Sequence, residues 1–272
     1  MEEIKKYCVK PGRRVRWDDV DPDDKGPFDK EKDALEETEG LIVKLDSLQE
    51  RLYAEGKRAL LIVLQAMDTA GKDGTIRHVM KGINPQGCRV ASFKAPTPEE
   101  RQHDFLWRVH RQVPAKGLIG IFNRSHYEDV LATRVHDLIS DREAKRRFGE
   151  INDFESMLVK NGTAVLKFYL AISKAEQRRR LQARLDDPHK RWKFSANDVA
   201  ERWYWDRYQE VYADAISATS AKHAPWYLIP ANHKWRRNYL VAKILVATLT
   251  EMDPRFPPAP QGIDFHKVKI PA

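Results

Sequence analysis

Residues 60–76 combine an apolar run, a loop of small residues and a single lysine, an arrangement suited to binding phosphate. The apolar residues 60–64 predict a buried strand, and the segment after Lys72 has a helical pattern. Small residues let backbone N–H groups approach an anion, Gly71 and Gly74 tolerate the dihedral angles of a tight loop, and the lysine adds charge beside the positive end of a helix dipole. The residues expected to contact phosphate are Ala70, Gly71, Lys72, Asp73, Gly74 and Thr75.

This loop departs from the strict P-loop pattern at two positions. Ala66 stands where that pattern has glycine, and Asp73 follows the lysine where a Ser or Thr hydroxyl would bind magnesium. Another group must therefore hold the metal. Asp68 lies inside the loop, where a carboxylate repels phosphate unless a cation or a protonated acceptor lies between them, and we interpret it as a magnesium ligand or a base. The structural alternative is that Asp68 caps the helix of an ordinary strand-to-helix turn.

The composition is that of an ordinary soluble protein. The chain has 272 residues, 42% hydrophobic and 32% charged, enough for one large or two small domains. No apolar run reaches the roughly 18 residues of a transmembrane helix, and residues 1–6 lead into no apolar signal core, so we expect a cytoplasmic protein without membrane contact. Cys8 and Cys88 are too few for a disulfide framework, and no Cys/His spacing predicts zinc.

The charge of the chain indicates an acidic partner. The net charge is +8 and the sequence pI is near 9.3, which fits nucleic acid, a membrane surface or a phosphate polymer. Residues 174–193 carry eight Lys or Arg against three acidic residues. Because these cations cannot all share one helical face, part of this charge belongs to a solvated surface.

Apolar strand-like runs alternate with helix-like segments along the chain, which predicts an α/β protein. Such alternation is typical of a parallel sheet with helices on both faces, and five strands fit the sequence. A Pro-rich tail follows over residues 253–272. The expected strands are 58–65, 88–93, 117–123, 163–172 and 225–229, and the expected helices are 29–55, 72–81, 98–112, one after Ser125, 141–160, 174–185, 196–219 and 232–252.

The strand 117–123 ends in a second group of polar residues, and ligands of such sheets bind at the carboxyl ends of strands. Asn123 stands where the Walker B aspartate of P-loop kinases would be expected. Arg124 is expected to reach the same phosphates as Lys72, because its planar guanidinium suits bidentate phosphate contact. Glu128 with Ser125 matches a capping box, so Glu128 either begins a helix or contacts a ligand. Asp129 has no capping role.

Residues 174–219 have the composition of a lid. Their centre, residues 184–193, is a polar loop interrupted by proline that carries cations at its tip. Kinases use mobile elements of this kind to close over phosphates and exclude water. The aromatic residues between 203 and 212 are interpreted as packing against the core or a second subunit rather than as a base-stacking surface.

The loop with Asp68, the segment 123–129 and the Arg-rich lid ending at residues 191–194 together resemble the polyphosphate kinase 2 family over about residues 10–250. This resemblance implies one P-loop kinase-like domain, a three-layer αβα sandwich over residues 1–272, that moves phosphoryl groups between inorganic polyphosphate and AMP or ADP, giving ADP or ATP. It implies Mg²⁺, with Mn²⁺ as an alternative ion. The Ser-His-Tyr-Glu-Asp version of the second motif is similar to class III, which accepts both AMP and ADP, whereas relatives restricted to ADP carry Ser-Trp-Tyr-Asn-Arg.

The same resemblance assigns roles to particular residues. It places Asp68 and Asp129 at the metal, and it implies adenine nucleotides, with guanine nucleotides as an extension, as partners of a homo-oligomer, a dimer or tetramer. Arg77 and Lys81 are four residues apart on the helix after the loop, so they share a face that follows a phosphate chain outward. The catalytic set is Asp68, Lys72, Arg124, Asp129 and Arg178; the polyphosphate set adds Arg77 and Lys81 to the loop residues, Arg124 and Arg178; the nucleotide set is Asn123, Glu128 and Arg134.

Two other functions remain open from the sequence. An ATP-dependent nucleoside monophosphate kinase would share the fold class, but it would be expected to keep Ser or Thr after Lys72. A nucleic-acid-binding module would explain the pI and the basic lid, but it would leave Asp68 and Asp129 as costly carboxylates in an anion site.

Overall fold

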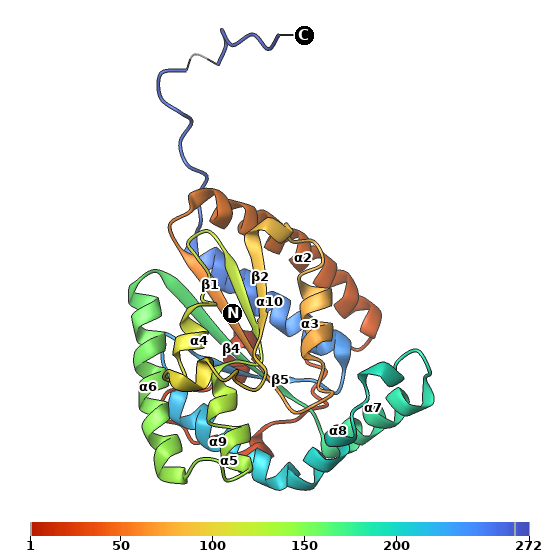
Figure 1. Ribbon diagram of the computed structural model, residues 1–272. Coiled ribbons are helices and arrows are strands. Elements are labelled where there is room, and N and C mark those ends of the chain that lie inside the picture. The colour runs from red at the N-terminus through yellow and green to blue at the C-terminus, as the bar shows by residue number, and fades with distance from the viewer. Residues whose placement is uncertain (1, 264, 272) are drawn as a thin grey trace.

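A five-stranded parallel sheet lies at the centre of the protein (Figure 1). The structure is a computed structural model that describes residues 2–263 and 265–271. The strands run in the spatial order β2-β3-β1-β4-β5, and every neighbouring pair is parallel, which confirms the expected fold class. The strand bounds are β1 Ala59–Gln65, β2 Cys88–Ser92, β3 Ile119–Asn123, β4 Thr163–Ala171 and β5 Trp226–Pro230.

Burial explains why the central strands read as continuous apolar runs. All seven residues of β1 are buried, because β3 and β4 flank this strand and helices cover both faces of the sheet. In the ladder, Leu60 of β1 is paired with Ile119 on one side and with Ala164 on the other. The register fixes where the strands end, and the loops after β1 and β3 therefore meet at one edge of the sheet.

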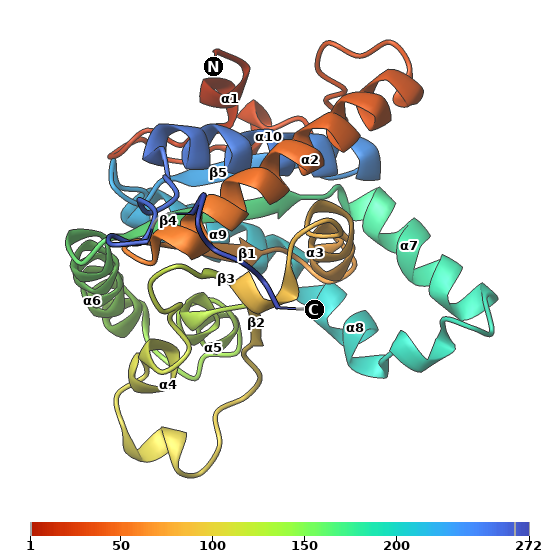
Figure 2. The same cartoon turned by 90° about the horizontal axis from the view of Figure 1, so that it is seen from above.

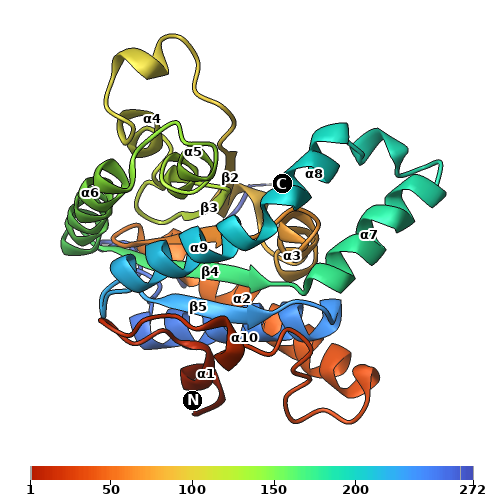
Figure 3. The same ribbon diagram turned by 90° about the horizontal axis from the view of Figure 1, so that it is seen from below.

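Helices form the two outer layers of the sandwich (Figures 2 and 3). The helices α2 (Glu31–Glu55), α3 (Lys72–Val79) and α10 (Lys234–Met252) cover one face. The opposite face is covered by α4 (Trp107–His110), α5 (Ala132–Val135), α6 (Asp141–Lys160) and α9 (Trp205–Thr219). The short N-terminal helix α1 (Glu2–Tyr7) lies beside β5 and α10.

Local side-chain hydrogen bonds shorten two of the expected helices. The expected helix 98–112 is wrong: a 3₁₀ turn, Glu100–Gln102, and α4 replace it. The Asp104 side chain accepts from the N–H of Leu106 at 3.0 Å, a turn contact that competes with helix formation. After β3, a 3₁₀ helix, His126–Asp129, precedes the short α5, because the Ser125 hydroxyl accepts from the N–H of Tyr127 and closes a tight turn.

The expected helix 196–219 is divided between an arm and the body. The arm consists of α7 (Lys174–Asp186), a 3₁₀ turn (Arg191–Lys193), α8 (Ala196–Glu201) and a second 3₁₀ turn (Arg202–Tyr204), and it projects from the sandwich (Figures 2 and 3). The helix α9 instead packs in the core, burying Trp205, Tyr212 and Ile216. Of the segment expected as a lid, only residues 174–204 therefore belong to the arm, and residues 205–219 form a core helix.

The two ends of the chain differ in how they pack. Residues after α1 run along the free side of β5, where Val9 donates its N–H to the carbonyl of Trp226 at 2.8 Å. The segment after Met252 has no helix or strand among its described residues and leaves the sandwich (Figure 1). Within residues 2–263 and 265–271, no helix combines the length and hydropathy needed to cross a membrane. Cys8 and Cys88 are both free thiols.

Candidate functional site

The candidate site lies where β1 and β3 end side by side. The chain leaves β1 toward α3 on one face of the sheet and leaves β3 toward α5 on the other. Two neighbouring parallel strands whose connections diverge in this way leave a crevice at their carboxyl ends, the usual ligand site of such sheets. A side-chain contact also joins the two ends: Asn123 Nδ2 donates to Asp73 Oδ1 at 2.8 Å.

The loop 66–71 has the geometry expected of a phosphate cradle. Gly71 is the N-cap of α3 with φ 106°, a left-handed angle that favours glycine. Lys72 follows, and its Nζ donates to the carbonyl of Ala66 at 2.9 Å, which folds the lysine back over the loop. Burial lowers the pKa of Lys72, and Asp68 opposes this shift. Asp68 does not cap the helix, because Gly71 holds the cap position.

Asp68 instead faces the end of β3. Its Oδ1 accepts from Arg124 Nη2 at 2.9 Å, so an acidic and a basic residue of the two motifs form an ion pair at the centre of the site. Thr69 (φ 65°) and Arg124 (φ 61°) both have left-handed backbones without being glycine. Such angles cost about 1–3 kcal/mol each and concentrate at functional sites.

Two cavities meet at this ion pair, since Asp68 and Arg124 line both. The larger, of about 740 Å³, lies between the phosphate loop and α7, and ten of its lining residues are Lys or Arg against three Asp. The smaller, of about 230 Å³, lies on the other side and is lined by Glu128, His136 and Tyr208 among others. The larger cavity therefore suits a polyanion, and the smaller one suits a ligand with polar and aromatic contacts.

Glu128 contacts the smaller cavity and does not complete a capping box. With the Gln65 amide oriented so that both its atoms have suitable partners, Gln65 donates to Glu128 Oε1 at 2.9 Å and accepts from the N–H of Ser125 at 3.1 Å. Gln65 thus accepts the hydrogen bond from the N–H of Ser125 that a capping glutamate would otherwise accept. Burial raises the pKa of Glu128, opposed by Arg124 and Lys72.

A buried ion pair supports the turn that carries Glu128. Lys167 of β4 pairs with Glu155 of α6, and both side chains are 0–1% exposed. Lys167 Nζ also donates to the hydroxyl of Tyr127 at 3.1 Å and to the carbonyl of Thr219 at 2.7 Å. Burial alone would raise the pKa of Glu155, but Lys167 and His126 reverse this effect and lower it. This ion pair therefore holds Tyr127 in place, one residue before Glu128.

Several residues expected at the site lie elsewhere. Lys81 pairs with Glu39 of α2, and neither Lys81 nor the exposed Arg77 lines either of the two cavities. Arg178 is exposed and also lies outside them, because α7 turns Arg179, Arg180 and Arg184 toward the larger cavity instead.

Two further expected residues are held by structural ion pairs. Asp129 is buried, and its Oδ2 accepts from Arg108 at 3.1 Å. Arg134 is bound between Asp141 and Asp214 at 2.6 and 2.9 Å. The structure does not bring Asp129 or Arg134 to the lining of either cavity, and their assigned roles stay predictions.

Sequence reasoning missed the residues that the last helix contributes. Lys234 and Arg237, in the first turn of α10, line the larger cavity beside the phosphate loop. The signal in the sequence was a run of cations at the start of a helix with no acidic residue, the reverse of the pattern that the helix dipole favours.

The strand order, the lysine loop and the cation-rich cavity define a P-loop kinase-like α/β protein. Comparison with known proteins gives the family. The family model for Polyphosphate kinase 2 (PPK2) matches residues 28–257, and the chain belongs to this family.

The similarity to individual members extends over almost the whole chain. An AMP/ADP-polyphosphate phosphotransferase of Meiothermus ruber is 54% identical over 93% of this chain and 96% of the relative. An ADP-polyphosphate phosphotransferase of Rhodopseudomonas palustris is 43% identical, over 94% and 92%. The crystal structure of Polyphosphate Kinase 2 from Arthrobacter aurescens TC1 superposes with a TM-score of 0.91 at 45% identity, over 94% of this chain and 92% of the other.

Proposed function

We propose that the protein transfers a phosphoryl group between inorganic polyphosphate and AMP or ADP, giving ADP or ATP. The observation that carries this proposal is the pair of cavities that meet at Asp68 and Arg124. A cation-rich space on one side suits a phosphate polymer, and a space lined by Glu128 and aromatic side chains on the other suits a nucleotide. The names of the relatives support both substrates.

The residues at the junction supply positioning and charge, which is most of what phosphoryl transfer requires. Lys72 and the N–H groups that begin α3 would hold the transferring group on the polymer side. Arg124 would contact its oxygens from the end of β3, once it exchanges its bond to Asp68 for one to phosphate. The cations of the arm, among them Arg184 and Lys193, line the same cavity and would exclude water when the arm closes.

We further propose that Mg²⁺, or Mn²⁺ in its place, binds at Asp68. In the described part of the chain, no three His, Cys, Asp or Glu side chains are grouped to hold a metal. That finding fits magnesium, which often takes one or two carboxylates and completes its shell with water and substrate phosphate oxygens. When bound, the ion would neutralise charge between phosphate groups. A role for Asp129 would require it to leave Arg108.

A product time course without ATP tests the proposed reaction. The protein is incubated with Mg²⁺, long-chain polyphosphate and AMP, ADP, GMP or GDP in separate reactions. We expect AMP to give ADP and then ATP, because one site would serve both acceptors. Formation of ADP from AMP only when ATP is added would instead identify an ATP-dependent monophosphate kinase.

Replacing Glu128 by Gln tests the nucleotide side of the site. This change removes the charge but keeps an amide able to bond to Gln65, so the melting temperature should barely change. We expect kcat/KM for AMP to fall severalfold while the apparent affinity for polyphosphate is kept. Glu150→Gln, which changes a partly exposed side chain on α6, is the control. Unchanged kinetics with both AMP and ADP would return Glu128 to a purely structural role.

Two properties of the whole molecule also remain proposals. We propose a homo-oligomer, a dimer or tetramer, in the cytoplasm, as the resemblance implied. Light scattering coupled to gel filtration measures the oligomeric state directly, and a monomeric mass would contradict this proposal.

A further inference from the structure

The first turn of α10 carries three cations, and two of them are buried. Lys234, Arg236 and Arg237 lie within four residues, this turn has no acidic residue, and Arg236 and Arg237 are 0% and 1% exposed. The helix dipole opposes cations at this end of a helix, and a buried charge is costly unless it is paired. Other parts of the chain must therefore hold this turn in place.

Arg237 links the turn to the phosphate loop. Its Nη1 donates to the carbonyl of Ala70 at 3.0 Å, and its Nη2 donates to the amide oxygen of Asn238 at 2.9 Å. A Cβ at Gly71 would lie 1.9 Å from Nη1, so the guanidinium lies directly against the loop backbone where α3 begins. If the first turn of α10 moved, the loop that carries Lys72 would lose this contact.

The neighbouring Arg236 is held by residues 2–28, called here the N-terminal strap. Its Nη1 donates to Glu3 Oε1 at 2.7 Å, and its Nη2 donates to the hydroxyl of Tyr7 at 2.7 Å. A Cβ at Gly26 would lie 2.2 Å from the central carbon of the guanidinium, so the strap passes directly over it. In the described part of the chain, Glu3 is the only carboxylate within ion-pair distance of Arg236.

Glu3 fastens two turns of α10 at once. Its Oε2 accepts from Lys243 Nζ at 2.6 Å, while its Oε1 accepts from Arg236. The two cations are seven residues apart, which is about two helical turns. Burial alone would raise the pKa of Glu3, but the hydrogen bonds from Lys243 and Arg236 outweigh burial and lower it. The carboxylate is therefore charged and neutralises the cations that it contacts.

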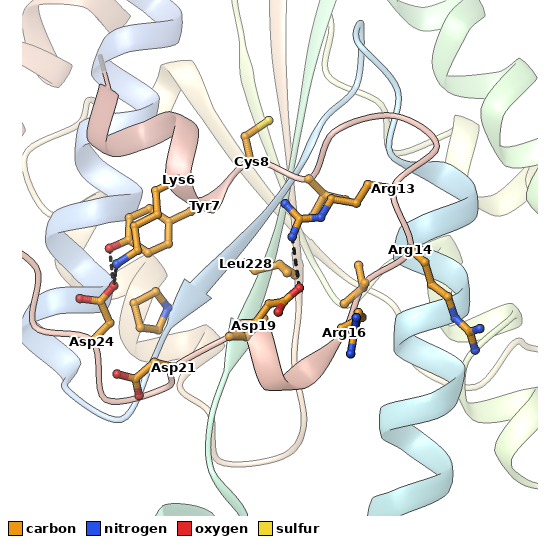
Figure 4. A pocket seen from close by; sticks show the side chains of 14 residues that line it. Lys6, Tyr7, Cys8, Arg13, Arg14, Arg16, Asp19, Asp21, Asp24 and Leu228 are labelled. Carbon is orange, nitrogen blue, oxygen red and sulfur yellow. Dashed lines mark hydrogen bonds and ion pairs between the residues drawn. The ribbon is translucent and has the colours of Figure 1, made fainter.

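Tyr7 joins Arg236 to a second part of the strap. The Tyr7 hydroxyl donates to Asp24 Oδ2 at 2.8 Å, and Lys6 pairs with the same carboxylate (Figure 4). Because a hydroxyl has one proton, this donation leaves its lone pairs to accept from Arg236. Lys6, Tyr7 and Asp24 also line a cavity of about 280 Å³ between the strap and β5. Both ends of the strap thus converge on one buried guanidinium.

The strap also contacts the connection between β5 and α10. Asn232 donates its N–H to the carbonyl of Pro22 at 3.1 Å, and His233 Nε2 lies 3.6 Å from Asp23 Oδ1. Arg180 of α7 donates to the carbonyl of Asn232 at 2.8 Å. The strap therefore supports the same short segment that the first helix of the arm contacts.

We propose that Glu3 is a positioning residue of the phosphate loop: it holds Arg236, and through the first turn of α10 it keeps Arg237 against the loop. Glu3 lines neither cavity of the candidate site, so it acts on that site only through α10. The kinetic consequences of this inference rest on the proposed function, whereas its consequence for the loop itself does not.

Glu3→Gln tests this role, because it removes the charge and keeps the size of the side chain. We expect KM for polyphosphate to rise about three- to tenfold, the usual size of an effect carried through packed side chains. A loop that is correctly placed in only a fraction of the molecules weakens apparent binding, and saturating ligand restores it, so kcat should stay the same. KM for AMP should also stay the same. A purely structural role would instead lower kcat per total protein at unchanged KM, because fewer molecules would be folded.

Hydrogen exchange gives a second readout that needs no substrate. The N–H groups of Ala70 and Thr75 are bonded to the carbonyls of Met67 and Gly71 within the loop and the first turn of α3. We expect both to exchange faster in Glu3→Gln than in the wild type, while the N–H groups of β1 keep their protection, because only the support of the loop is weakened.

Glu2→Gln is the matched control, since it changes an exposed glutamate of the same helix. Tyr7→Phe removes the second acceptor of Arg236 and should act in the same direction as Glu3→Gln, and it decides if Glu3→Gln does not fold. In an Arg236→Met background, Glu3→Gln should have little further effect on either readout, because its main partner is gone.

Wild-type KM and wild-type exchange of the loop in both Glu3→Gln and Tyr7→Phe would overturn the proposal, even if their melting temperatures fell. No product from polyphosphate with the wild-type protein would count against the proposed function alone, since the exchange of the loop would still decide the role of Glu3.

Discussion

Lys72→Ala is expected to lower turnover with polyphosphate by about two to three orders of magnitude, as when a preorganised charge is removed from a site of transferring charge. Lys72 begins α3, and its Nζ already lies over the loop through its bond to Ala66. The charge is therefore in place before substrate arrives, and it should act more on the transferring phosphoryl group than on the ground state. kcat at saturating polyphosphate and AMP is the quantity to measure.

Asp68→Asn should have an effect of similar size for a different reason, since it removes the proposed metal ligand and the partner of Arg124. Both variants should keep the wild-type melting temperature, because Lys72 and Asp68 are only half-buried and support no core contact. Lys160→Ala, on the far end of α6, serves as the matched control for the loss of a lysine. Turnover within a few-fold of wild type for either site variant would remove the active-site assignment.

The sheet and the two strand-end motifs were predictable because their signals are local. Buried parallel strands read as continuous apolar runs, and the loop 66–71 is defined by small residues next to one lysine. Asn123 and Arg124 were placed correctly at the end of β3 for the same reason. The two motifs were expected to lie close together because each follows a strand of the same parallel sheet, and the carboxyl ends of such strands lie at one edge.

The sequence does not predict which face of α7 points toward the site. Successive residues of a helix are about 100° apart, so the basic residues 178–180 point in three directions, and only packing decides which one faces the site. In the structure Arg180 is buried against the carbonyls of the phosphate loop while Arg178 is exposed. In this structure the cations that line the larger cavity, among them Arg184, Lys190 and Lys193, are placed for the proposed lid function, and the role expected of Arg178 stays a prediction.

Partners that are distant in the sequence account for the other differences. The residues next to Asp129 in the sequence do not indicate that it is buried. Its ion-pair partner, Arg108, comes from a separate segment of the chain. Arg237 is 167 residues from the Ala70 carbonyl that it contacts. Contacts of this kind depend on which helices cover which face, and no periodicity within one segment encodes them.

Lys167→Met is expected to destabilise the fold by about 3–5 kcal/mol, the usual cost of removing one partner from a buried ion pair. Glu155 would be left charged and 1% exposed, and the carbonyl of Thr219 would lose its donor. Urea unfolding measures the change. Arg146→Ala is the matched control on α6, where the ion pairs with Glu143 and Glu150 are exposed and should matter little.

The double variant Lys167→Met with Glu155→Gln separates the pair from its packing. Because the uncompensated charge is removed, the double variant should unfold at higher urea than Lys167→Met alone, a non-additive result expected for residues in contact. Losses that simply add would show that the two charges are not coupled. A functional readout follows from Tyr127, whose hydroxyl bonds to both members of the pair one residue before Glu128. In variants that stay folded, KM for AMP should therefore rise while KM for polyphosphate changes little, because the loosened turn carries Glu128, which lines the smaller cavity and not the larger one.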